Sequence, residues 1–565
     1  MEKFKTVICS LSAKYIHATL APWCIYEGVK KYAPCVTAKV IEGTINEKEE
    51  AVIKRITAEK PDAVGFCCYI WNIERVLFIA SKAKELLPFC KIILGGPEVS
   101  FNEERVLSEN PFVDFIISGE GERAFAETVK AISENKLPEN NIASYFYEDR
   151  LIKGKYNIFE EELSPYNEEY LSALNGRISY MESSRGCPYS CTFCLSGSEK
   201  RVRFFSMEKV KREMLLLSKS GSQTVKFVDR TFNANKKRAI EILSFIKESY
   251  GKEIPSGVCF HFEIAADILD EEILSVISLM PKGSVQFEVG IQSFNEATLS
   301  KINRKTNLQR LSQNVKALVS FQKCHIHTDL IAGLPFEDMA SFKESFNKAY
   351  ELGANMLQLG FLKILHGSQM EKTTDEYVVS FSKKPPYEVT ATPWMTRDEL
   401  SSLHNTEDAL ERLHNSGRFK RTLDYALSSA KIKPFDLFEG FGNFVKDKNK
   451  KRPTLDEYTL WAYEYFSSLD GIDKAILRDT MITDRLATNS SGIIPQCLQV
   501  KDERLKRVKY LLSLMCPTGK DVKRTVAIIY TKNTVLFCDY KEKGAVSGEY
   551  ELKTVDLSEF EGMSK

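Results

Sequence analysis

Short apolar runs alternate with amphipathic, helix-length stretches from the start of the chain to about residue 135. The apolar runs are KTVICSL, TAKVIEG, DAVGFCCYI, KIILGGPE and FIISGEGE, and segments such as 21–32 and 51–59 have a helical pattern. An alternation of strands and helices is typical of an open parallel sheet covered by helices. The pattern therefore predicts a flavodoxin-like α/β domain over residues 1–150.

Four segments follow predicted strands of this domain and should share one rim: 10–17, 69–71, 95–98 and 119–122. Ligands of open α/β sheets bind beyond the carboxyl ends of the strands. Aromatic side chains there could stack on a flat ligand and carboxylates could accept hydrogen bonds, although packing between domains and helix capping explain the same residue types. The candidate substrate contacts are Tyr15, His17, Tyr69, Trp71, Glu98 and Glu120.

A second series of six strand and helix units begins at Arg177. Its strands read RISYMES, TVKFVD, GVCFHFEIA, SVQFEVGIQS, CHIHTDLIAG and NMLQLGFLKIL. Six successive units predict a partial (β/α)6 barrel over residues 175–380. Residues 385–565 have a mainly helical pattern that ends in a β-hairpin around Lys532 and Asn533, and we expect these helices to cover the mouth of the barrel.

Composition excludes several classes of function. Lys plus Arg (78) balances Asp plus Glu (77), so no basic face predicts a nucleic acid partner. No apolar run is long enough to span a membrane, and the first residues lack the apolar core of a signal peptide, so we expect a cytoplasmic protein. The 14 cysteines are then expected as reduced thiols or metal ligands.

The strongest chemical signal is ESSRGCPYSCTFC, which places Cys187, Cys191 and Cys194 at C-x3-C-x2-C spacing directly after a strand. Cubane iron–sulfur clusters are normally held by four thiolates. A local set of three leaves one iron open for another ligand. The alternatives are unrelated core thiols or a structural zinc site, but such zinc sites close with four ligands and no second Cys/His group follows.

This motif resembles that of the radical S-adenosylmethionine (SAM) superfamily, and the resemblance extends over about residues 175–370. It implies a [4Fe–4S] cluster whose open iron binds the methionine end of SAM, cleavage of SAM to a 5′-deoxyadenosyl radical, and an electron donor such as flavodoxin or ferredoxin. Later strand ends resemble the segments that contact SAM, although local capping explains polar residues there equally well. The resulting candidate contacts are Phe193, Asp229, Arg230, Asn233, Glu263, Glu288, Gln292, Ser293 and Gly333.

The first domain resembles the cobalamin-binding domain that precedes the barrel in one radical SAM class. The resemblance rests on PDAVGFCCYIWN, KIILGGPEVS and FIISGEGERAF. No Asp-x-His-x-x-Gly sequence is present, so a lower axial histidine of that type is excluded. Members of the class can bind cobalamin without such a ligand, and cobalamin stays open as a third cofactor.

The segment AKYIH around His17, together with PYEVTATPWMTRDELSSLHN, resembles a subgroup of this class whose most similar named function is queuine lyase. That resemblance implies cleavage of the C–N bond of free queuine, a small-molecule substrate, to give 7-aminomethyl-7-deazaguanine. The first alternative is a cobalamin-dependent radical SAM methyltransferase. The second is a non-enzymatic iron–sulfur sensor or electron carrier, which four-thiolate ligation would favour.

Overall fold

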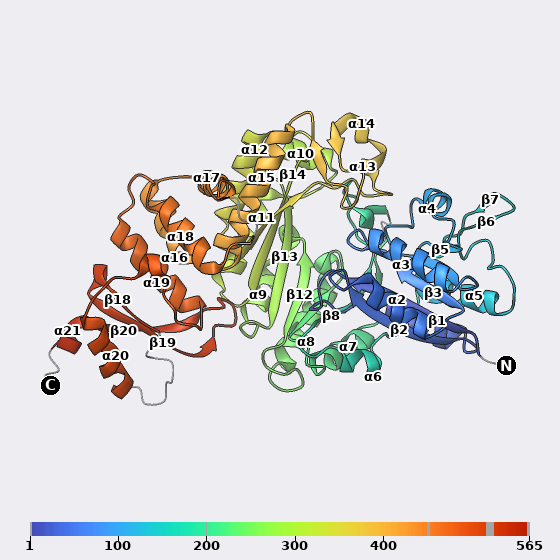
Figure 1. Cartoon of the computed structure of the whole chain (residues 1–565), viewed down its shortest axis with the longest axis horizontal. Helices are drawn as coiled ribbons and strands as arrows, with labels where there is room; N and C mark the ends of the chain where they lie inside the picture. Colours follow the sequence, from blue (N-terminus) through green and yellow to red (C-terminus); the bar gives the residue numbers. More distant parts are fainter. Residues whose placement is uncertain (1–2, 199–200, 449–451, 516–524, 562–565) are drawn as a thin grey trace.

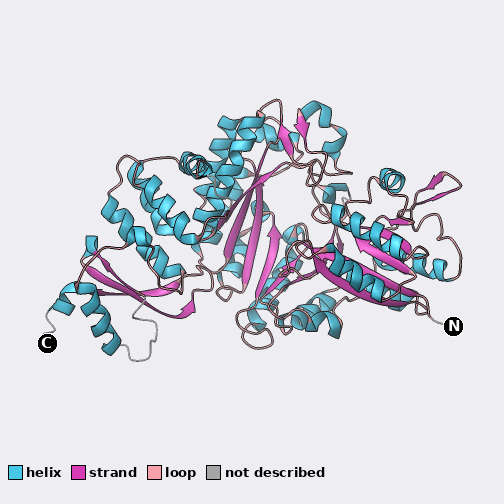
Figure 2. Ribbon diagram, in the orientation of Figure 1, coloured by secondary structure: helices cyan, strands magenta, loops and turns pink. Residues whose placement is uncertain are grey.

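The computed structural model describes residues 3–198, 201–448, 452–515 and 525–561. The molecule is elongated, with an N-terminal α/β region at one end, a six-stranded sheet at the centre and a helical region with a small sheet at the other end (Figure 1). Figure 2 shows that helices cover the two larger sheets. The predicted α/β class is confirmed. Among the described residues, no helix is both long and apolar enough to cross a membrane.

The N-terminal sheet is fully parallel and has the strand order β2-β1-β3-β4-β5. Its strands are β1 (Lys5–Ser12), β2 (Thr37–Thr44), β3 (Ala63–Cys67), β4 (Lys91–Gly95) and β5 (Phe115–Ile117). This is the flavodoxin-like order, in which the chain changes direction between β1 and β3 and leaves a crevice at the carboxyl ends of those strands. The topology therefore marks one expected ligand site.

Both faces of this sheet are covered by helices, which explains why β3 is apolar along its whole length. The helices α1 and α5 pack against each other, and so do α2 and α3. Their bounds are α1 (Ala21–Tyr32), α2 (Glu49–Ala58), α3 (Ile73–Leu86), α4 (Glu103–Glu109) and α5 (Gly121–Ser133).

The central sheet has six parallel strands in the order β15-β14-β13-β12-β11-β8, and the predicted six-unit partial barrel is confirmed. The strands are β8 (Ile178–Met181), β11 (Thr224–Phe227), β12 (Cys259–Ile264), β13 (Val285–Gln292), β14 (His325–Ala332) and β15 (Met356–Phe361). The helices of the series are α7 (Met207–Ser218), α8 (Lys236–Ser249), α9 (Glu271–Ser278), α10 (Glu296–Lys301), α11 (Leu308–Ser320) and α12 (Met339–Tyr350).

The loop after β1 joins the two sheets. Ile178 of β8 donates its backbone N–H to Ile16 O at 2.7 Å, and Ala18 N–H donates to Ile178 O at 3.1 Å. Arg177 adds an ion pair to Glu42 at 3.0 Å. Because β8 is an edge strand, these bonds satisfy backbone groups that would otherwise lack partners. They also bring the carboxyl ends of both sheets to one shared space.

The C-terminal helices pack along edge strand β15, and their coverage of the barrel mouth stays a prediction. Asn415 exchanges two side-chain hydrogen bonds with the backbone of Leu357 in β15, at 2.9 and 3.0 Å. The helices are α15 (Arg397–Leu410), α16 (Lys420–Ala430), α17 (Pro434–Lys446), α18 (Leu455–Phe466), α19 (Lys474–Thr488) and α20 (Arg504–Met515).

The hairpin expected near the end of the chain is confirmed, and a third antiparallel strand extends it. The strands are β18 (Val526–Ile529), β19 (Thr534–Lys543) and β20 (Tyr550–Asp556). The division of the chain at residues 150, 175–380 and 385–565 stays a prediction.

Candidate active site

The three motif cysteines lie in the loop after β8 and line one cavity of about 170 Å³ at the carboxyl ends of β11 to β14. Cys187 and Cys191 are buried and Cys194 is half-buried, and all three are free thiols. Three thiols at one cavity wall match the donor set of an iron–sulfur cluster with one open iron. The residues therefore fit a [4Fe–4S] cluster with a small molecule beside it.

A segment far away in the sequence holds the cysteine loop in place. Four contacts join residues 302–304 to residues 190–192: Thr192 N to Ile302 O at 3.0 Å, Asn303 Nδ2 to Ser190 O at 3.0 Å and to Ser190 Oγ at 2.7 Å, and Arg304 Nη1 to Cys191 Sγ at 3.9 Å. Burial raises the pKa of the Cys191 thiol, and Arg304 opposes that rise. The arginine therefore favours the thiolate that a metal cluster requires.

Five of the nine predicted SAM contacts line the cysteine cavity. They are Phe193, Arg230, Glu263, Glu288 and Gln292. Phe193 lies in the cysteine loop and the other four lie on or after the strands β11, β12 and β13, and the contact of all five with SAM stays a prediction.

The other four, Asp229, Asn233, Ser293 and Gly333, are not among the residues that line it. Asp229 is buried and accepts hydrogen bonds from the backbone and hydroxyl of Ser183 at 2.8 and 2.6 Å. Asn233 exchanges two bonds with the backbone of Ala265, at 2.8 and 2.9 Å. The Asp229 and Asn233 side chains hold turns within the protein, which is the local role that strand-end polar residues often have.

Two carboxylates on adjacent strands of the cavity differ in protonation. Burial alone would raise the pKa of Glu288, but hydrogen bonds from His261 at 2.9 Å and Lys226 at 3.0 Å bring it down to about 2. Glu263 lies farther from Lys226, at 4.0 Å, and burial raises its pKa to about 7 although Arg230 and Lys226 oppose the rise. The site thus holds one fixed negative charge and one carboxyl group that titrates near neutral pH.

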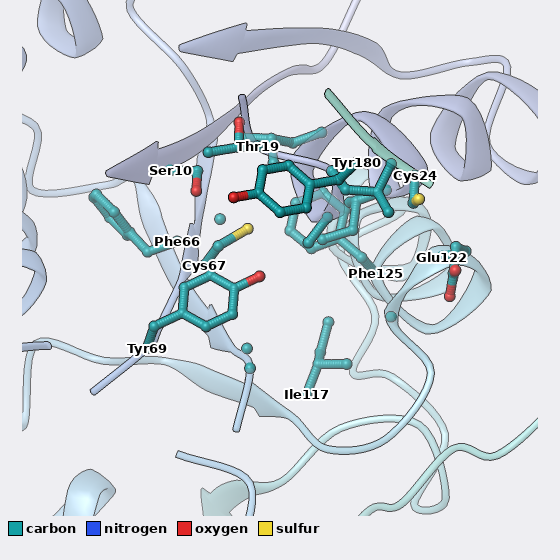
Figure 3. A pocket seen from close by; sticks show the side chains of 18 of the residues that line it. Ser10, Thr19, Cys24, Phe66, Cys67, Tyr69, Ile117, Glu122, Phe125 and Tyr180 are labelled. Atoms are coloured by element: carbon teal, nitrogen blue, oxygen red, sulfur yellow. The ribbon is translucent and has the colours of Figure 1, made fainter. Parts of the chain in front are cut away.

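A larger cavity of about 640 Å³ lies at the carboxyl ends of β1, β3, β4 and β5 and continues to β8 and β11 of the barrel. Figure 3 shows Ser10, Cys67 and Tyr69 of the N-terminal region around this space, together with Tyr180 of β8. The cavity lies at the crevice between β1 and β3 that the sheet order marks. Its position and its wall of mainly small and apolar residues fit a large flat cofactor such as cobalamin.

Four of the six predicted rim residues line this larger cavity: His17, Tyr69, Trp71 and Glu120. The rings of Tyr69 and Trp71 stack on each other, with centroids 4.5 Å apart. Glu120 is paired with Arg203 at 2.7 Å and with a second arginine, Arg185. The aromatic pair is therefore available to a ligand, whereas the carboxylate already has partners.

The other two rim residues lie outside it. The side chain of Tyr15 is 74% exposed beneath the guanidinium of Arg177. Glu98 is buried and accepts a hydrogen bond from the hydroxyl of Tyr387, so it joins the N-terminal region to the segment after the barrel. Both residues have structural contacts that the strand pattern did not indicate.

Sequence reasoning missed Tyr180, whose hydroxyl contacts His17 Nδ1 at 2.7 Å. Burial lowers the pKa of His17, and the charges of Lys14 and Lys226 lower it further, so this imidazole is held neutral. The alternation of RISYMES could have identified Tyr180, because it lies on the opposite face of β8 from the buried Ser179 and Met181.

Comparison with known families gives three matches along the chain. Residues 11–129 match the B12 binding domain, residues 181–349 match the radical SAM superfamily, and residues 375–520 match a family described as "Protein of unknown function (DUF4080)". The radical SAM match contains all residues that line the cysteine cavity, and the two matches together contain most of those that line the large cavity.

Two curated relatives and one solved structure illustrate the similarity. An uncharacterized methyltransferase from Pyrococcus horikoshii is 26% identical over 57% of this chain and 71% of its own length. The cobalamin-dependent radical SAM methyltransferase TokK from Streptomyces tokunonensis is 24% identical over 52% of this chain and 45% of its own length. The structure of the cobalamin-dependent SAM radical enzyme OxsB superposes with a TM-score of 0.60 at 14% identity, over 93% of this chain and 83% of OxsB, which supports the fold.

Proposed function

We propose that this chain, which is a radical SAM enzyme with a B12-binding domain before its barrel and a further region after it, is a cobalamin-dependent methyltransferase of a small molecule. The cofactors of this class are a [4Fe–4S] cluster and SAM, and the B12-binding domain adds cobalamin. The observation that supports the proposal is the meeting of two cavities. The cysteine cavity and the larger cavity have Arg230 as a shared wall residue.

When bound, SAM and the cluster supply a radical and SAM supplies a methyl group, which cobalamin carries. The chain's own residues prepare the site for this chemistry. The three cysteines hold the cluster, Arg304 contacts Cys191, and the charged Glu288 stays paired with Lys226. Cys187 and Cys191 are buried, which limits the access of water to the reacting groups and protects a radical from side reactions.

The queuine lyase interpretation finds no support in the comparisons, whereas the methyltransferase alternative agrees with the names of both curated relatives, which are methyltransferases. The chain spans 71% and 45% of those relatives, so the substrate and the electron donor, such as flavodoxin or ferredoxin, are part of the proposal. The alternative of an iron–sulfur sensor or electron carrier is not supported, because residues 181–349 match the radical SAM superfamily.

The test is an anaerobic assay of the protein with a reconstituted cluster, SAM and a reductant, with and without cobalamin. At least one equivalent of S-adenosylhomocysteine per enzyme, formed only when cobalamin is present, is the expected result. If 5′-deoxyadenosine forms without S-adenosylhomocysteine, the methyltransferase proposal fails while the radical SAM assignment holds. Release of 7-aminomethyl-7-deazaguanine from added queuine would instead support the lyase.

A further inference from the structure

Arg230 has an unusual position at the junction of the two cavities. Of the described residues, it alone lines both the larger cavity and the cysteine cavity. Its side chain is exposed there, and within the described part of the chain no hydrogen bond or ion pair engages its guanidinium. A cation inside a site, rather than on the outer surface, is thus left without a fixed partner.

The backbone around Arg230 is fixed on both sides. The preceding residue, Asp229, accepts a hydrogen bond from the backbone N–H of Ser183. The hydroxyl of the following residue, Thr231, contacts Cys187 Sγ at 3.6 Å. Asn233 is bonded twice to the backbone of Ala265. The turn therefore holds the backbone of Arg230 at a constant place relative to the cysteines.

The other arginines at these cavities already have partners. Arg185 is paired with Glu122 at 2.6 Å and with Glu182 at 2.8 Å. Arg304 donates to Gly290 O at 2.5 Å as well as to the cysteine loop. The unpaired group is consequently the one that faces the space where a substrate between the two cofactors would lie.

We propose that Arg230 binds a carboxylate or phosphate group of the substrate, which makes the methylated substrate a small organic anion. A guanidinium presents two parallel N–H groups that match such oxyanions, and the pair gains strength when ligand binding removes water. The inference rests on the proposed function, because a substrate between the cavities is required for it. The carboxylate of SAM is the other source of the same chemistry, and the experiment distinguishes the two.

The experiment measures how fast phenylglyoxal modifies Arg230, by peptide mass spectrometry, in the cobalamin-loaded protein with its cluster. Oxalate and inorganic phosphate serve as probes of the anion site. We expect either probe to slow the modification of Arg230 about tenfold, whether or not SAM is present, while the exposed Arg212 on α7 reacts as before. Protection by SAM alone would assign Arg230 to the SAM carboxylate and overturn the proposal, as would an absence of protection by both probes.

Variants give an independent measurement. Arg230→Gln should weaken the binding of oxalate or phosphate about 10- to 100-fold and change the Kd of SAM less than about twofold. Arg230→Lys keeps the charge but loses the paired donors, so its affinity for oxalate or phosphate should lie between those of the original protein and Arg230→Gln. Arg212→Gln is the matched control. A large loss of SAM affinity in Arg230→Gln would contradict the proposal. Because anion binding needs no turnover, its outcome is separate from the outcome of the methyl transfer assay.

Discussion

Arg304 donates from Nη1 to the sulfur of Cys191 at 3.9 Å, although 113 residues separate them in the chain. The same guanidinium donates from Nη2 to Gly290 O in β13. One side chain therefore connects the cysteine loop to the strand that carries Glu288. The loop and the proposed SAM pocket are held in a fixed relation before any cofactor binds.

Replacing Arg304 with Gln should lower the reduction potential of the cluster. Hydrogen bonds and positive charge next to the ligand sulfurs stabilise the reduced cluster, so their removal favours the oxidised one. We expect a shift on the order of 60 mV, equivalent to a tenfold change in a one-electron equilibrium, measured by redox titration with EPR detection. Arg304→Lys should shift the potential less, and an unchanged potential in Arg304→Gln would limit this residue to a structural role.

Replacing Cys191 with Ala should abolish cluster incorporation and SAM cleavage without unfolding the chain. The change removes one buried sulfur from a loop that its backbone contacts still hold. Iron and sulfide analysis and the visible absorption of the reconstituted protein measure the loss. The matched control is Cys497→Ala, a half-buried thiol that lines neither cavity. Full SAM cleavage by Cys191→Ala would refute the cluster assignment.

The sequence predicted the sheets and the cysteine loop because those signals are local. Strand alternation and the spacing of Cys187, Cys191 and Cys194 need no knowledge of distant partners. The same logic placed Glu263 and Glu288 at neighbouring strand ends, and parallel register sets them opposite each other. The positions of residues at strand ends could therefore be predicted from the sequence, because they follow from the order of the strands.

The contacts of Arg304 and Glu98 could not be predicted in this way. Arg304 meets Cys191, and Glu98 meets Tyr387, across 113 and 289 residues. Asp229 likewise has a partner that the strand pattern did not indicate, because its carboxylate accepts a hydrogen bond from the Ser183 hydroxyl, and its contact with SAM stays a prediction. A polar residue type fixes what a side chain can bind, and tertiary packing decides which partner it finds.

Replacing Gly121 with Trp should block cobalamin and leave the cluster intact. Gly121 lines the larger cavity at the start of α5, and a Cβ added there would lie 3.7 Å from Ile25, an ordinary contact. A side chain can therefore start from this position without a backbone clash at its Cβ, and we expect the bulk of an indole to fill cavity space. We expect loss of cobalamin binding in equilibrium dialysis, with cluster content unchanged.

Gly121→Ala is the matched control for that change, because its methyl group fits in the same place and should leave cobalamin binding within about twofold of the original. Cobalamin binding by Gly121→Trp at the original affinity would show that the cofactor lies elsewhere.

Glu263 makes the stability of the cluster-free protein depend on pH. Burial raises its pKa from the ordinary 4.5 to about 7, so the folded state binds this proton more tightly than the unfolded state does. Stability from Glu263 is then full below about pH 4.5 and is lost as the pH rises through about 7. Glu263→Gln, which is neutral throughout, should gain about 2 kcal/mol over the original protein between pH 5 and 8, measured by urea unfolding.

Glu248 on α8 is exposed, so Glu248→Gln is the control and should leave the free energy of unfolding unchanged across that pH range. A second variant links the effect to the junction of the cavities. Arg230 holds the pKa of Glu263 down, so Arg230→Gln should raise that pKa further and extend the loss of stability to higher pH. If the difference between Glu263→Gln and the original protein stays flat from pH 5 to 8, the carboxyl group is ionised throughout and Arg230 compensates its charge, which would contradict the raised pKa.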